Sequence, residues 1–229
     1  MSITATHLTR AAGVSAVAAG LLFLGVQINH PQLDADFVTT TEWSVRQSLK
    51  VLMSGLSLVG ITGMYLRQVK QSGVFGLLGY VIFGVGYLIM ISVEVIGLVV
   101  LPSVAHSSPG YVNDVLAAAT GGHPAGDIGL LQPLTLVAGL TYMAGGLVFG
   151  IALFRAKILA RWAAVLLAAG TVSSILIPLL PQVNERLFAV PTGVALVGLG
   201  YSLWRGQRTA AVGTLPRVAG SPLDPAGAK

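Results

Sequence analysis

Glu94 lies in an uninterrupted apolar run, residues 73–101, in which no other side chain is charged. The run is long enough to cross a bilayer, and a charged group in the middle of a bilayer costs about 2.5–3.5 kcal/mol on insertion scales. Ionisable residues at that depth generally face a protein interior or a wet cavity and mark a functional site. We therefore expect Glu94 to be the group that carries the chemistry of this chain.

Two phenols share the helix face of this acid. Tyr80, Tyr87 and Glu94 are spaced by seven residues, and seven residues return an α-helix to within ~20° of the same direction. Counted back from Pro102, Glu94 lies ~12 Å below the end of the helix, in the outer half of the membrane. A carboxyl group desolvated there favours its neutral, proton-donating form unless a cation is near.

A cation is available on another predicted helix. Glu42, Arg46 and Lys50 are spaced by four residues and would line one helix face, which lets Lys50 reach inward toward Glu94. One interpretation is an outward-facing substrate cavity in which Glu94 is the catalytic acid. The other is a structural Glu94–Lys50 ion pair, with the hydroxyls bonding their own helix carbonyls. In the cavity interpretation, the residues that line the substrate cavity are Tyr80, Tyr87, Lys50, Gln132, Ser173 and Ser174.

Other chemistries find little support in the sequence. No HExxH or comparable ligand spacing relates the loop acids to the histidines, so no metal site is predicted. GxSxG and GxxxxGK motifs are absent, and no motif indicates a cofactor. The loop groups considered as metal ligands were His30, Asp34, Asp36, His106, His123 and Asp127.

The composition is that of a polytopic membrane protein. Of the 229 residues, 54% are hydrophobic and 9% are charged, and the mean hydropathy is +0.82. The chain has no cysteine, which excludes disulfides and thiol nucleophiles. The net charge of +5 is explained by basic residues on one side of the membrane and does not indicate nucleic-acid binding.

Apolar periodicity predicts an all-α bundle of six transmembrane helices within residues 1–204. The first span is expected to be a retained helix, because no clear A-x-A cleavage site follows it. Small residues predict tight packing in the fourth and fifth spans, at Gly146 and Gly150 and at Ala164 and Ala168. The expected spans are 8–27, 47–66, 73–101, 129–154, 158–180 and 187–204.

The basic residues predict the orientation. Ten of the thirteen Lys and Arg residues lie on the side shared by both termini and the two short turns, so both termini should be cytoplasmic. The exceptions are Arg46, Lys50 and Arg186. The connection 102–128 reads as a long outer loop, and residues 205–229 as a disordered cytoplasmic tail. We expect the chain to reside in a bacterial inner or plasma membrane, in contact with lipid.

Two segments of the chain have the sequences GLTYMAGGLVFGIALFRAKILARWAAVLLAAG and LTRAAGVSAVAAGLLFL. They resemble an uncharacterised group of small bacterial multi-span membrane proteins that is classed as a domain of unknown function. The most distinctive part is the basic turn RAKILARW, although many members carry a proline where this chain has Ala160. The resemblance covers less than half of the chain. It implies a helical bundle and supplies no catalytic residue.

Two classes of function follow from these observations. In the first, an intramembrane enzyme acts on a lipid or isoprenoid, with Glu94 protonating an alkene or epoxide while aromatic faces stabilise the cation. Small membrane-bound terpene cyclases are similar in size and use membrane carboxylates in this way. In the second, a non-enzymatic carrier, immunity factor or accessory subunit uses Glu94 as a proton or cation site.

Overall fold

The computed structural model describes residues 4–29, 31–179, 187 and 189–213, and it is all-helical over these ranges. Two short 3₁₀ segments, η1 (Phe37–Thr39) and η2 (Ser174–Leu179), accompany seven α-helices in the described residues. The α-helices are α1 (Ala5–Gly25), α2 (Thr41–Arg67), α3 (Val69–Val104), α4 (Pro109–Ala119), α5 (Leu131–Ala156), α6 (Arg161–Ser173) and α8 (Ala189–Gly213).

Four of these helices, α1, α2, α3 and α5, are long and apolar enough to cross a membrane. Their outward faces carry exposed apolar side chains such as Leu77, Val99 and Leu136, which suits a lipid environment and not water. The protein is thus indicated to be a membrane protein. The expected count of six spans is not confirmed, because neither α6 nor α8 is among these four helices.

Helix α6 has 13 residues, which is about 20 Å at 1.5 Å per residue and less than a bilayer core of about 30 Å. The chain then tightens into η2, which contains Pro178. A proline has no backbone N–H and its ring collides with the preceding turn of an α-helix, so the α-helical geometry ends before it. The expected last outer turn, residues 181–186, lies outside the described residues.

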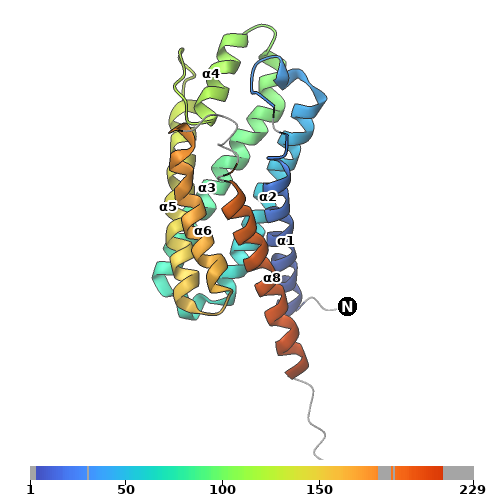
Figure 1. Ribbon diagram of the computed structural model, residues 1–229, viewed down its shortest axis with the longest axis vertical. Helices are drawn as coiled ribbons and strands as arrows, with labels where there is room; N and C mark the ends of the chain where they lie inside the picture. Colours follow the sequence, from blue (N-terminus) through green and yellow to red (C-terminus); the bar gives the residue numbers. More distant parts are fainter. Residues whose placement is uncertain (1–3, 30, 180–186, 188, 214–229) are drawn as a thin grey trace, which may run out of the picture.

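Six of the helices form a closed ring in the order α1, α2, α3, α5, α6, α8, with α8 packed back against α1. Gly13 of α1 lies against the backbone of Gly200 in α8, and Gly20 lies against Gly193. The two helices are therefore antiparallel, and the start of α1 and the end of α8 lie at the same end of the molecule (Figure 1). Helix α8 extends to Gly213, beyond the expected end of the sixth span, and residues 214–229 lie outside the described part.

The predicted small-residue steps meet each other across the α5–α6 interface. A Cβ atom at Gly150 would contact Ala168 and the carbonyl of Ala164, and one at Gly146 would contact Thr171. In lipid, where apolar burial gives no net drive, such close backbone approach is a main source of helix association. The tight packing expected from these residues is confirmed.

The end of the bundle that holds α4 is more ordered than expected. Helix α3 continues through Pro102 to Val104, and the connection expected to be a loop contains α4. Val112, Val115 and Leu116 of α4 form a second apolar core with Val38 of η1 and Leu101 of α3. Helix α4 starts with Pro109 in its first turn, where a missing N–H costs nothing. The apolar face of this short helix packs on the end of α3 and the start of α5, which gives a cap above the ring (Figure 1).

Candidate functional site

Glu94 forms an ion pair with Lys50 at the α2–α3 interface. Lys50 Nζ lies 3.7 Å from Glu94 Oε2, and the two side chains are 19% and 18% exposed. The amide Nε2 of Gln47, one turn earlier on α2, donates a hydrogen bond of 2.7 Å to the same oxygen. The ion pair anticipated from the sequence is present, and Glu94 Oε2 is surrounded by donors.

Trp43, one turn before Gln47 on α2, and Gly97, one turn after Glu94 on α3, lie beside this pair. The indole Nε1 of Trp43 donates to the carbonyl of Gly97 at 2.9 Å, and Trp43 is 3% exposed. A side chain at Gly97 would occupy the place of the Gln47 amide, so only glycine leaves room for it there. Lys50 Nζ also lies 5.9 Å from the centre of the Trp43 ring, within the range of a cation–π contact. The indole is thus a direct neighbour of the ion pair.

The Tyr80–Tyr87–Glu94 face of α3 is directed at α2. The Tyr80 hydroxyl lies 3.0 Å from Thr62 Oγ1, and its ring stacks on Tyr65 with centroids 4.8 Å apart. Tyr87 is fully buried, and its hydroxyl faces Ser57 without completing a hydrogen bond to any described residue. The shared face expected from the spacing of seven is therefore an interhelical seam.

The remaining expected cavity residues lie apart from Glu94. Ser173 Oγ and Ser174 Oγ donate to the carbonyls of Gly170 and Thr171 on their own helix, at 2.8 and 2.6 Å. Helix α6 packs against α5 and α8, whereas Glu94 lies between α3 and α2. Gln132 is exposed in the first turn of α5. For these hydroxyls the arrangement agrees with the structural interpretation, in which they bond their own helix.

Two surface depressions on the described part of the chain also lie away from Glu94. One is an apolar groove between α5 and α6, and it includes Ser173. The other lies between the end of α1 and the start of α2, and it includes Glu42 and Arg46. Neither is lined by Glu94, Lys50, Tyr80 or Tyr87.

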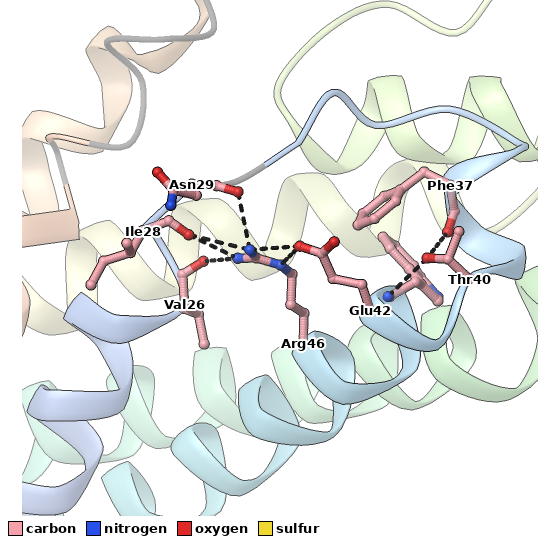
Figure 2. A network of polar contacts seen from close by, with 8 residues as sticks. Val26, Ile28, Asn29, Phe37, Thr40, Glu42 and Arg46 are labelled. Atoms are coloured by element: carbon pink, nitrogen blue, oxygen red, sulfur yellow. Dashed lines mark hydrogen bonds and ion pairs between the residues drawn. The ribbon is translucent and has the colours of Figure 1, made fainter.

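Arg46 is used to close the end of α1. Its guanidinium donates to the carbonyls of Val26, Ile28 and Asn29 at 3.0–3.3 Å, and it pairs with Glu42 at 2.7 Å (Figure 2). Val26 is the C-terminal cap of α1, and Ile28 and Asn29 follow it. The C-terminal end of a helix carries partial negative charge, which a nearby cation stabilises. Glu42, Arg46 and Lys50, which were expected to line one helix face, thus have different neighbours. Arg46 binds the end of α1, whereas Lys50 pairs with Glu94 of α3.

The carboxylates between α1 and α2 and between α3 and α5 bind backbone N–H groups. Asp34 Oδ1 accepts from the N–H of Phe37, and Asp127 Oδ1 accepts from the N–H of Gly129, both at 2.7 Å. The two oxygens of Asp114 accept from Ala125 and Gly126. Within the described residues no three His, Asp or Glu side chains gather as metal ligands, and His30 lies outside them.

Sequence reasoning missed Gln47, Trp43 and Gly97. The signal for the first two was helical spacing, since Trp43, Gln47 and Lys50 lie four and three residues apart and so share one face of α2. Gly97 lies one turn after Glu94, where a residue without a side chain in an apolar helix indicates close approach of another group.

The chain was compared with family models, with curated proteins and with solved structures. No family model, curated protein or solved structure matches it. The resemblance to a group of small bacterial membrane proteins stays a prediction.

Proposed function

We propose that this chain is a non-enzymatic, carrier-type protein of a bacterial cell membrane, in which the Glu94–Lys50 pair near the outer surface binds a proton. The proposal takes all six ring helices to lie in the membrane, with both termini in the cytoplasm. The antiparallel packing of α1 on α8 supports an even number of crossings. The ten basic residues on the side of the termini support the orientation.

The observation that carries the proposal is the surroundings of Glu94 Oε2. This oxygen accepts from Gln47 at 2.7 Å and faces the Lys50 ammonium at 3.7 Å. An acid that protonates an alkene needs its proton directed into a substrate cavity, whereas donors converge on Oε2. Donors that face a carboxyl oxygen suit the carboxylate form of Glu94, which can accept a proton and has none to donate. Both side chains are partly exposed, which leaves a route by which a proton can reach them.

Trp43 supplies a test that needs no substrate. Protonation of Glu94 would release Lys50 and alter the field at the neighbouring indole, and so would change the emission of Trp43. The chain has three tryptophans, so Trp162→Phe and Trp204→Phe leave Trp43 as the reporter. In nanodiscs, we expect an emission change with pH that is lost in Glu94→Gln. Glu42→Gln is the matched control, because Glu42 is an exposed carboxylate on the same helix and should leave the titration intact.

Two results would reject the proposal. One is a Trp43 titration that is unchanged in Glu94→Gln. The other is a lipid-soluble product, formed from an isoprenoid by the purified protein and lost in Glu94→Gln, which would favour the terpene-cyclase-like enzyme instead. Flux or protonation that depends on Glu94 without product formation supports the carrier.

A further inference from the structure

The seam between α2 and α3 carries polar side chains over most of its length. Three α3 residues spaced by seven each meet a polar residue of α2. Glu94 accepts from Gln47, the Tyr87 hydroxyl faces Ser57, and the Tyr80 hydroxyl contacts Thr62. The partners on α2 run in the opposite order along the chain, as expected for two antiparallel helices. A polar line in the interior of an apolar membrane protein is costly, and an ionisable group on such a line marks a proton or ion path.

Several oxygens along this line have no hydrogen-bond partner in the described part of the chain. They are Gln47 Oε1, Ser54 Oγ and the Tyr87 hydroxyl, on residues that are 3%, 0% and 0% exposed. Gln68 at the other end of α2 is 1% exposed and also carries a buried Oε1 without a partner. Burying such groups in an apolar medium costs several kcal/mol each, and ordered water is the usual way in which proteins satisfy them.

We propose that the α2–α3 seam is a hydrated proton path that leads from Glu94 to Gln68 at the opposite end of the bundle. The inference rests on the proposed function, since Glu94 is the entry site, and it names the transported species as the proton. Along an α-helix, the seven residues from Tyr87 to Tyr80 span ~10 Å and the six from Thr62 to Gln68 span ~9 Å. A few water molecules bridge each of these steps.

The chemistry of the line favours protons over metal cations. Hydroxyl groups both donate and accept, so each can take a proton on one side and release another on the other side. A metal cation would have to pass the Lys50 ammonium and would find no cluster of carboxylates among the described residues. Proton transfer only needs the Glu94 carboxylate to be freed from Lys50.

The proton transfer along the seam needs no other reactant. A proton from the outer solution binds a Glu94 oxygen, and the contact with Lys50 loosens. The carboxylic acid then releases its proton to the water beside Gln47 Oε1 and Ser54, and the carboxylate pairs with Lys50 again. The Tyr87 hydroxyl accepts a proton from one side and gives its own to the other side, as does Tyr80 next to Thr62. One proton leaves near Gln68, no bond is oxidised or reduced, and each group returns to its starting state.

Proton flux in proteoliposomes tests the path. An interior pH-sensitive dye, with a potassium gradient and valinomycin to set the membrane potential, reports proton entry. Wild-type protein should exceed protein-free liposomes, and Tyr87→Phe and Ser54→Ala should lose this excess. Tyr87→Phe removes a buried hydroxyl without a partner, so the fold should persist. Tyr201→Phe is the matched control, because Tyr201 is 51% exposed on α8, and it should conduct like the wild type.

The Trp43 titration separates this inference from the proposed function. Tyr87→Phe should lose flux while Trp43 still titrates, because Glu94 remains intact. Wild-type flux equal to that of protein-free liposomes, or normal flux in Tyr87→Phe, overturns the path and leaves the proton site standing. Loss of both flux and titration in Tyr87→Phe also overturns it, since the effect would then arise at Glu94. Flux driven by a sodium gradient and not by a proton gradient would contradict the choice of ion.

Discussion

Lys50 Nζ lies 3.7 Å from Glu94 Oε2, on helices α2 and α3 that run antiparallel along the same seam. The pair brings together the one charged residue of the apolar run 73–101 and a cation of the neighbouring helix α2. Each side chain is about four-fifths shielded, which places the pair between a surface ion pair, worth up to about 1 kcal/mol, and a buried one, whose disruption costs about 3–5 kcal/mol.

The effects of replacing Glu94 and Lys50 on the free energy of unfolding should be coupled. We expect Lys50→Met or Glu94→Gln alone to lower the free energy of unfolding by about 1–3 kcal/mol, because each leaves a shielded group without its partner. The double variant should recover much of that loss, a coupling that a double-mutant cycle on thermal or denaturant unfolding in detergent measures. Additive losses would mean that the two charges do not interact appreciably.

Replacing Arg46 should loosen the junction between α1 and α2. Arg46→Met removes the donor to three backbone carbonyls, those of Val26 at the C-cap of α1 and of Ile28 and Asn29 just after it, so a loss of about 2–3 kcal/mol is expected. Glu42→Gln is the control, since its 53% exposed carboxylate contributes at most about 1 kcal/mol. Melting temperatures compared across the two variants check this, and equal shifts would contradict the capping role.

Two glycines of α5 offer a matched test of the α3–α5 packing. A Cβ atom at Gly145 would collide with the backbone of Phe83, whereas one at Gly139 would meet nothing within 4 Å. Gly145→Ala should therefore cost about 1–3 kcal/mol through overpacking. Gly139→Ala should be neutral or stabilising by up to about 1 kcal/mol through helix propensity. The pair can be ranked by thermal aggregation in detergent, and a destabilising Gly139→Ala would indicate a contact outside this chain.

Membrane orientation can be tested with single cysteines. The chain has no native cysteine, and Gln71, Ser108 and Lys157 are all exposed. An impermeant thiol reagent added to intact cells should label Ser108→Cys and should leave Gln71→Cys and Lys157→Cys unlabelled until the membrane is permeabilised. The reverse pattern would invert the proposed orientation.

The sequence by itself predicted the helical elements that carry the site. The apolar run around Glu94, the small-residue steps at Gly150 and Ala168 and the Glu94–Lys50 pair were all readable from residue type and spacing. The reason is that a bilayer offers no water to backbone groups, so each apolar segment must satisfy its own hydrogen bonds as a helix, and this constraint is local. Residue spacing then sets which side chains share a face of that helix.

Only the tertiary structure decided what each face meets. The spacing of seven placed Tyr80, Tyr87 and Glu94 on one side of α3, but the rotation of α3 about its axis, which turns that side toward α2, comes from its packing with α5 and α2. The division between Arg46 and Lys50 depends in the same way on where α1 ends relative to α2. The choice of Gln47 as the donor to Glu94 depends on the close approach at Gly97. Such relationships join segments far apart in the chain, and they are set by the packing of side chains that no local pattern encodes.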